Sequence, residues 1–164
     1  YELNDECKKV KIEFMASIFQ TEFLKITESI KMKRYKIASR SVNDKKLINK
    51  IAKLNKPIIL SLGMWNKDYF PFKELKKIKY LFCVSKYPAP KSAINFSKNF
   101  FKEYDGFSDH TIGIEKAKQS IQLGAKILEK HFTIDKKLDG PDHRLSILPK
   151  ELKLLHEFRL EKTK

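Results

Sequence analysis

Short apolar runs alternate with segments of helical periodicity along most of this chain, and no other feature constrains its fold as strongly. Strand-like runs are expected at 13–19, 34–39, 57–62, 79–84, around 106–107 and at 125–132. Helical spacing of apolar residues predicts helices at 22–30, 44–54, 111–123 and 149–160. Asn43 or Asp44 is a plausible N-cap, and the last helix is expected to bury Leu152, Leu155 and Phe158. This alternation indicates right-handed βαβ units and a parallel sheet, which is an α/β fold.

Polar residues follow nearly every predicted strand. They are Ser39, Ser61, Ser85 with Tyr87, residues 108–110, and Lys130 with His131. A doubly wound open sheet could hold about six such units, but in a (β/α)8 barrel these strand ends converge on one mouth, where the active site lies. Residues 64–81 form a connection that is too short for a full barrel helix.

The chain of 164 residues has the size of one ordinary domain, and 41% hydrophobic residues are enough to bury a core. Its 35 basic and 20 acidic residues give a net charge of +15, which favours anionic partners. Most of the excess is lysine spread along the chain, whereas nucleic-acid binders more often gather Arg, Lys and aromatic residues into one patch. Basic nucleic-acid binding is therefore only the weaker alternative, and neither a nucleic acid nor a membrane is the expected partner.

Cys7 and Cys83 are far apart in the sequence, and Cys83 lies in an apolar run. A reduced, cytoplasmic setting is expected from this usage. No stretch is long and apolar enough to span a bilayer, and no secretory signal is recognisable, so we expect a soluble protein. The chain opens with Tyr1 in a polar, helical-looking segment, which is typical of the interior of a longer product.

Two histidines at the ends of consecutive predicted strands form the strongest candidate site. His110 lies in the run GFSDHT and His131 in EKHFT. Two neutral imidazoles facing one point suit a divalent metal such as manganese, iron or zinc, with positions left open for substrate. No HExxH or CxxC signature sharpens this interpretation, and two independently satisfied buried histidines are the alternative.

A second group combines one lysine with hydroxyls at strand ends. Its members are Lys36, Ser39, Ser61 and Ser108. Hydroxyl donors, backbone amides near Gly63 and one cationic amine are what a phosphate group needs. The alternative is that each serine caps a following helix.

Two turns add weaker candidates. The Pro88-Ala89-Pro90 sequence predicts a rigid loop that could hold Tyr87 over a ligand, or pack it on the rim as a structural turn. In the tight turn at 140–143, the Asp142 carboxylate could accept hydrogen bonds from sugar hydroxyls.

Read in order, six segments carry a family resemblance. They are RYKIAS, PIILSLGM, CVSKYPAP, GFSDHTIGIE, GAKILEKHFT and GPDH. From about residue 14 to 152, the chain resembles the sialic acid synthase family, the NeuB-like N-acetylneuraminate synthases and their legionaminate, pseudaminate and 9-phosphate relatives. The resemblance implies that residues 1–164 form an incomplete (β/α)8 barrel with about strands 3 to 8, lacking the N-terminal strands and the C-terminal antifreeze-like domain.

The resemblance also implies a reaction. Members of the family condense phosphoenolpyruvate with an N-acylated amino sugar such as N-acetylmannosamine, giving a nine-carbon 2-keto acid and phosphate. They need a divalent metal, for which we expect Mn²⁺, with Mg²⁺ or another ion as alternatives. The full-length family is expected to form homodimers.

Roles for single residues follow from the matched motifs. His110 and His131 would bind the metal, and with Lys36 they are the expected catalytic residues, while Asp109 would orient the site. The residues expected to bind phosphoenolpyruvate are Ser17 at its carboxylate and Lys36, Ser39, Ser61 and Ser108 at its phosphate. The residues expected to face the sugar are Ser85, Tyr87 and Asp142.

The chain departs from the family pattern at several positions. Arg40 and Ser41 stand where the family commonly has glycine and an acidic residue, and Ser85 stands where some members carry asparagine. A carboxylate near the reacting carbons is thus absent from its usual position. These departures keep a second interpretation open, an inactive fragment or non-catalytic remnant of such a synthase.

Overall fold

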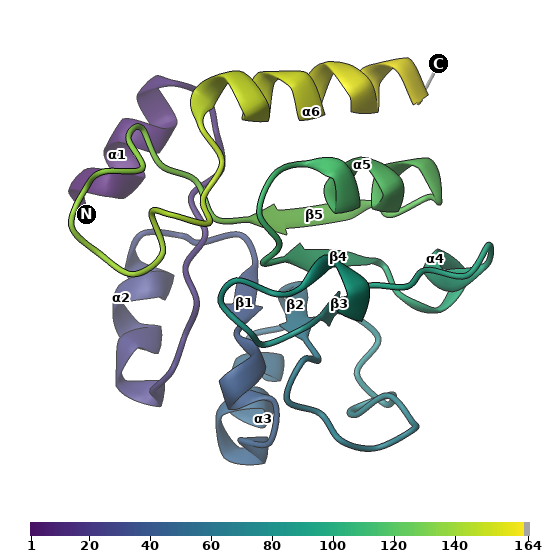
Figure 1. Cartoon of the computed structure of the whole chain (residues 1–164). Coiled ribbons are helices and arrows are strands. Elements are labelled where there is room, and N and C mark those ends of the chain that lie inside the picture. Colours follow the sequence, from purple (N-terminus) through teal and green to yellow (C-terminus); the bar gives the residue numbers. More distant parts are fainter. Residues whose placement is uncertain (163–164) are drawn as a thin grey trace. The chain divides into compact units, whose positions relative to one another are not determined.

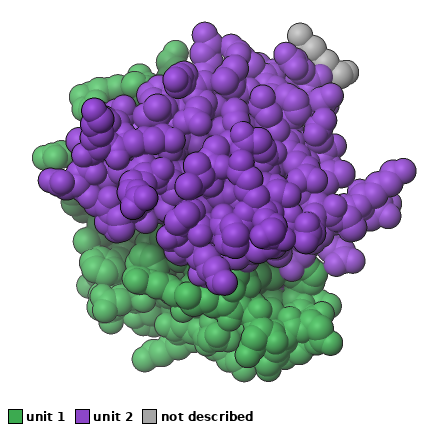
Figure 2. All heavy atoms as spheres, in the orientation of Figure 1, with its two compact units in different colours: residues 1–79 green, residues 80–164 purple. Residues whose placement is uncertain are grey.

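The computed structural model describes residues 1–162 (Figure 1). The expected domain of residues 1–164 includes residues 163 and 164, which lie outside the described residues. The chain divides into two compact units, residues 1–79 and 80–164, coloured separately in Figure 2. Each unit is described by itself.

The first unit contains a pair of short parallel strands among helices. Its elements are α1 (Glu2–Lys9), α2 (Leu24–Ser29), β1 (Tyr35–Ile37), α3 (Lys45–Ala52) and β2 (Ile58–Ser61), with 3₁₀ helices at Thr21–Phe23 and Ser39–Ser41. β1 pairs with β2 in the register Lys36↔Ile59, and every residue of both strands is buried. Burial of both strand faces is typical of a parallel sheet.

Helix α3 matches its sequence prediction closely. Asp44 is the N-cap, and its side chain accepts a hydrogen bond from the Leu47 amide at 2.9 Å. The helix buries Leu47, Ile48 and Ile51, which lie on one face.

The strand expected at 13–19 does not form a ladder. Only Ser17 bridges to Lys36 of β1, and the Ile18 amide donates to the Lys36 carbonyl at 3.1 Å. Because this single residue pair is all that meets β1, the segment stays extended but irregular, with Met15 and Phe19 exposed. The expectation of a full strand here is therefore wrong.

Polar contacts hold helix α2 to β1. Thr27 is buried and its hydroxyl lies 2.9 Å from the Tyr35 hydroxyl, which donates to Glu28 at 2.5 Å. Lys56 completes the network with an ion pair to Glu28 at 2.6 Å. Burial and the hydrogen bond to Glu28 raise the pKa of Tyr35 to about 12. The apolar periodicity that predicts this helix is not its means of attachment, because Phe23 and Ile26 are about half exposed.

Three helices of the first unit end in the same way. A non-glycine residue with positive φ follows each of them: Lys11 after α1, Lys31 after α2 and Asn55 after α3. These left-handed residues turn the chain sharply at the end of a helix. Residues 63–77 then form turns without a helix, which confirms that this connection is too short for one.

The second unit has three parallel strands. Its elements are β3 (Ile78–Cys83), which begins in the first unit, α4 (Phe100–Glu103), β4 (Gly106–Asp109), α5 (Glu115–Gln122), β5 (Ile127–Lys130) and α6 (Pro149–Lys162), with a 3₁₀ helix at Lys91–Ala93. β3 pairs with β4 and β4 with β5, all parallel. Helix α5 begins later than the expected residue 111, because Gly113 with φ +83° lies in the preceding turn.

Two apolar clusters support the second unit. Phe107 of β4 is fully buried in an aromatic cluster that includes Phe82, Phe96 and Phe101. Helices α5 and α6 pack together through the buried residues Ala117, Ile121 and Leu155, and Ile147 before α6 belongs to the same cluster.

The burial predicted for helix α6 is partly wrong. Leu155 is buried and Phe158 packs against the cluster, as expected, but Leu152 is 48% exposed. Its side chain lines a cavity of about 290 Å³ beside the helix, so it does not contact a closed core. Within residues 1–162, no helix combines the length and apolar character needed to cross a membrane.

Gly106 provides a test of the strand pairing. A Cβ at this position would overlap the backbone carbonyl of Ile127 on β5, so the two strands would have to move apart. We expect Gly106→Ala to lower the free energy of unfolding by about 3 kcal/mol, measured by urea denaturation. Gly124→Ala is the control, because open space surrounds it and only its φ of +96° opposes a side chain, at a cost of about 1 kcal/mol. Equal losses in the two variants would contradict the close approach at Gly106.

Candidate active site

The pairing of β4 with β5 sets the arrangement of the candidate metal ligands. Ser108 lies opposite Glu129, and Asp109 lies opposite Lys130. Because side chains alternate along a strand, Ser108 and Glu129 share a face, and Asp109 and Lys130 share the opposite one. Their contacts agree: the Ser108 hydroxyl donates to Glu129 at 2.5 Å. The next residue on each strand is a histidine.

The structure brings His110 and His131 together, as the sequence predicts. Their ring centroids are 5.3 Å apart and the rings are inclined at 61°. His110 is 6% exposed, and its Nδ1 lies 3.0 Å from the Val84 carbonyl oxygen. A carbonyl can only accept, so Nδ1 carries the proton and Nε2 keeps its lone pair.

Burial keeps His110 in the form that a metal needs. It lowers the pKa of His110 below the ordinary value of 6.5, and the neighbouring His131 acts in the same direction, against the Val84 carbonyl. His131 has a partner of its own, because its Nδ1 lies 3.6 Å from an Asp142 carboxylate oxygen. Carbonyl and carboxylate groups behind imidazole rings are the usual means of orienting them as metal ligands.

The donor set therefore fits a metal bound by two imidazoles. Among residues 1–162, no group of three or more His, Cys, Asp and Glu side chains could hold an ion together. His110 and His131 could hold an ion between them, and water or substrate would complete its coordination. Such a site is open and suits catalysis better than a structural role.

Tyr87 covers this pair of rings. Its ring centroid lies 4.3 Å from that of His110 and 5.7 Å from that of His131. The Ala89 amide donates to the His110 carbonyl at 2.9 Å, which anchors the proline-containing loop beside the strand end. Burial raises the pKa of Tyr87, although about half of the side chain is exposed. The loop thus holds Tyr87 over a candidate ligand site, as expected.

Cys83 and Glu129 also belong to this site, although the sequence analysis assigned them no role. Cys83 lies opposite Ser108 in the pairing of β3 with β4, and its Sγ is 3.7 Å from Nδ1 of His110. The same Sγ lies 3.8 Å from the hydroxyl of Ser85. Glu129 precedes His131 by two residues, and the alternation of a strand could have indicated that the two share a face.

Asp109 lies on the other face of β4 and forms a buried ion pair. Lys130 donates to its carboxylate at 2.9 Å, and their side chains are 3% and 0% exposed. The Thr111 amide donates to the same carboxylate at 2.8 Å, and Lys130 also donates to the Thr111 carbonyl. Because Asp109 and Lys130 each precede a histidine, their ion pair holds the two strands in the register that places the imidazoles together.

Ser146 anchors the turn at 140–143, which carries Asp142. The Ser146 amide and hydroxyl donate to the Asp142 carbonyl at 3.1 and 2.7 Å. The carboxylate, half exposed, faces His131.

All but Ser108 of the residues predicted to bind phosphate lie in the first unit. Lys36 of β1 is 4% exposed, and its amine donates to the Ser61 hydroxyl at 2.8 Å and to the Ile37 carbonyl at 3.1 Å. The Ser39 hydroxyl accepts from the Met64 amide at 2.8 Å. Ser17 meets β1 at Lys36. The side chains of three serines predicted to bind phosphate thus contact residues far away in the sequence and do not cap the helices that follow them. These serines are Ser39, Ser61 and, in the second unit, Ser108.

Arg40, a departure from the family pattern, has a structural contact. Its guanidinium lies 3.9 Å from the ring centroid of Phe19. This cation–π contact covers an exposed aromatic residue.

Comparison with known proteins identifies the family. The model of the NeuB family matches residues 1–162. The N,N'-diacetyllegionaminic acid synthase of Campylobacter jejuni is 38% identical over 94% of this chain and 50% of its own length. The N-acetylneuraminate-9-phosphate synthase of Drosophila melanogaster is 34% identical over 94% of this chain and 45% of its own length. The chain spans about half the length of the curated relatives it matches.

Solved structures show the same fold. The N-acetylneuraminic acid synthetase of Leptospira borgpetersenii, in complex with citrate, superposes with a TM-score of 0.89 over 99% of this chain and 61% of that chain, at 32% identity. A DAHP synthase of Thermotoga maritima superposes with a TM-score of 0.73 at 14% identity, which concerns the fold alone. The expected incomplete (β/α)8 barrel is confirmed.

The buried ion pair behind the histidines can be tested by stability. Lys130→Met leaves the Asp109 carboxylate buried without its counter-ion, and we expect it to lower the free energy of unfolding by about 3 to 5 kcal/mol. The double variant Asp109→Leu/Lys130→Met removes both charges and should recover at least half of that loss in urea denaturation. An additive loss in the double variant would contradict a coupled pair.

Proposed function

This chain belongs to the NeuB family, and we propose that it carries binding and catalytic groups of a sialic-acid-synthase-like transferase. The reaction joins C3 of phosphoenolpyruvate to C1 of an N-acylated amino sugar such as N-acetylmannosamine. Water adds at C2, and phosphate leaves as its bond to C2 breaks, giving a nine-carbon 2-keto acid. The paired imidazoles of His110 and His131, 5.3 Å apart, are the observation that carries this proposal.

His110 and His131 would hold the metal, with Mn²⁺ as the expected ion. When bound, such an ion polarises the aldehyde carbonyl of the open-chain sugar as a Lewis acid. The Val84 carbonyl holds Nδ1 of His110, so its Nε2 is directed away from that contact. Tyr87 packs against both rings and would limit access of water to them.

Lys36 would bind the phosphate of phosphoenolpyruvate. Its buried amine and the neighbouring hydroxyl are the charged and neutral donors that a phosphate needs. The Ser61 hydroxyl fixes the position of the amine, and Ser39 and Ser17 lie at the same strand. Fixed donors of this kind hold the leaving group in place without covalent chemistry.

Glu129 and Asp142 would act on the sugar. Glu129 accepts a hydrogen bond from Ser108 and shares a strand face with it, so its carboxylate could accept hydrogen bonds from hydroxyl groups bound beside the histidines. Asp142 faces His131 from a half-exposed turn and would accept hydrogen bonds at the outer edge of the same site. Ser85, beside Cys83, is the third candidate contact.

The second interpretation, a non-catalytic remnant or fragment, rests on Arg40. This cation stacks on Phe19 at the position where the family commonly has glycine, and Ser41 replaces the acidic residue. A site that binds metal without turning over substrate would favour this interpretation.

Metal binding can be measured by thermal unfolding. At a Mn²⁺ concentration of about 100 times Kd, we expect the melting temperature to rise by about 5 to 10 °C, because binding at that excess stabilises the folded state by about 2.7 kcal/mol. His110→Ala/His131→Ala should abolish this rise. His156→Ala, an exposed histidine of α6, is the matched control and should keep it. A shift of equal size in the double variant would place the ion elsewhere.

Turnover can be measured as phosphate released from phosphoenolpyruvate with Mn²⁺. We expect release to require N-acetylmannosamine, and Lys36→Met to lower kcat/KM about 100-fold, because it removes a fixed cation from the departing phosphate. The exposed Lys25→Met is the control and should leave the rate unchanged. Mn²⁺ binding without phosphate release would support the non-catalytic interpretation.

A further inference from the structure

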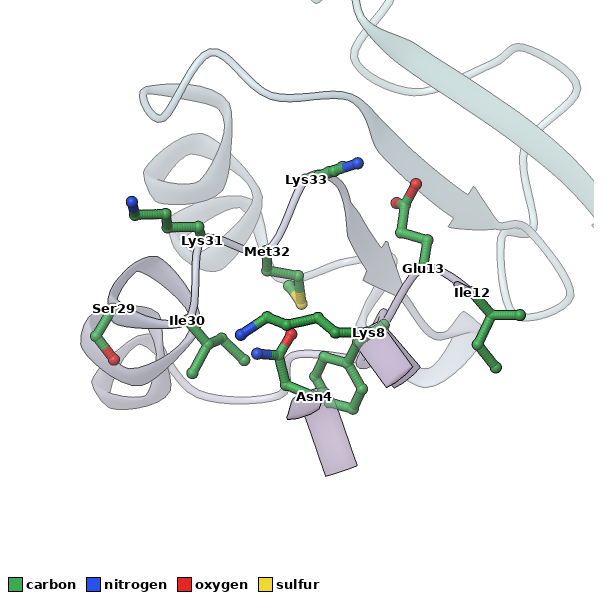
Figure 3. A pocket seen from close by; sticks show the side chains of 10 residues that line it. Asn4, Lys8, Ile12, Glu13, Ser29, Ile30, Lys31, Met32 and Lys33 are labelled. Carbon is green, nitrogen blue, oxygen red and sulfur yellow. The ribbon is translucent and has the colours of Figure 1, made fainter. Parts of the chain in front are cut away.

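The first unit contains a pocket that is separate from every residue of the candidate active site. It has a volume of about 490 Å³, within the range of small-molecule sites. Helix α1, the extended segment after it and the end of α2 form its walls (Figure 3). The lining residues are Asn4, Lys8, Ile12, Glu13, Phe14, Ser29, Ile30, Lys31, Met32 and Lys33.

Asn4 is an unpaired polar group in this pocket. Only 8% of the residue is exposed, and its amide side chain has no hydrogen-bond partner among residues 1–162. Figure 3 shows the amide extending into the pocket, as does the Lys8 side chain. The amide is not fully withdrawn from solvent, so it can hydrogen-bond to water or to a ligand that enters the pocket.

The charge of the lining is positive. The lining includes three lysines, Lys8, Lys31 and Lys33, and one carboxylate, Glu13. Arg34 already binds this carboxylate at 2.6 and 3.0 Å. Lys31 and Lys33 have no ion-pair partner within the described chain, and Lys8 contacts only the exposed Asp5. Their long, flexible stems allow the amines to close onto an anion at the pocket edge.

The remaining walls are apolar. Ile12, Phe14, Ile30 and Met32 line the pocket together with the polar groups. Inorganic phosphate alone would leave these walls in contact with water. A ligand with an anionic end and an apolar or aromatic body would use both kinds of surface, and the Asn4 amide can donate to an anion oxygen.

We propose that this pocket binds a small organic phosphate whose apolar or aromatic body packs on the Phe14 wall, with the Asn4 amide and the lysines at the phosphate. A dianionic phosphate matches the excess of two positive charges among the lining residues better than a single carboxylate does. The site lies wholly in residues 1–79 and uses none of the candidate catalytic residues. It is thus a second site, and its occupancy does not depend on the proposed function.

Calorimetric titration of the whole chain with phenyl phosphate tests the proposal. We expect phenyl phosphate to bind at least tenfold more tightly than inorganic phosphate, and benzyl alcohol, which has the ring without the charge, to bind more weakly than either. Binding of phenyl phosphate no tighter than that of inorganic phosphate would overturn the assigned ligand class.

Variants locate the binding. Asn4→Asp keeps the side-chain shape but repels an anion, and it should weaken phenyl phosphate binding at least tenfold. Asn4→Leu should weaken binding similarly without lowering the melting temperature, because no hydrogen bond is lost. Lys31→Met/Lys33→Met should also weaken binding at least tenfold, whereas Lys25→Met, an exposed lysine of α2 outside the pocket, should not.

The outcomes separate this site from the candidate active site. Unchanged binding in Asn4→Asp would overturn the proposal. If Lys36→Met loses phenyl phosphate binding and Asn4→Asp keeps it, the ligand binds at the residues predicted to hold phosphate in the candidate active site. That result would also overturn the proposal.

Discussion

The register between β4 and β5 is the constraint on which the candidate active site depends. Gly106 allows the Ile127 carbonyl to approach at one end of the pair, and the Asp109–Lys130 ion pair holds the other end. A shift of one residue would exchange the two faces of a strand. His110 and His131 could then no longer lie on the same face. The backbone pairing therefore decides whether the two imidazoles can share a metal ion.

Most buried polar groups of residues 1–162 are matched by partners, and the Thr111 hydroxyl is the fully buried side-chain atom without one. Tyr35 has Thr27 and Glu28, Asp109 has Lys130, and the Ser108 hydroxyl has Glu129. Asn4 lacks such a partner within the described chain and faces a cavity. Its amide reaches the solvent of a cationic pocket, where a bound ligand could accept its hydrogen bonds.

Much of the fold could be predicted from the sequence because apolar periodicity reports burial directly. It located all five strands of residues 1–162, the helices α3, α5 and α6, and the Asp44 cap. It failed at 13–19, where an apolar run meets β1 at one residue only, and at Leu152, which lines an open cavity. In both cases the residue type favours burial, but nothing in the local pattern shows how much of a neighbouring element is there to cover it.

The sequence by itself determined the α/β class, the family, and the presence of two histidines at the ends of adjacent strands. Only the tertiary structure decided which atoms these residues meet: Val84 beside His110, Lys130 on Asp109, Ser61 on Lys36, and, among residues 1–162, no partner for Asn4. The physical reason is that periodicity depends on neighbours along the chain. Hydrogen-bond partners depend instead on strand register and helix ends, which bring together residues more than 20 positions apart in the sequence.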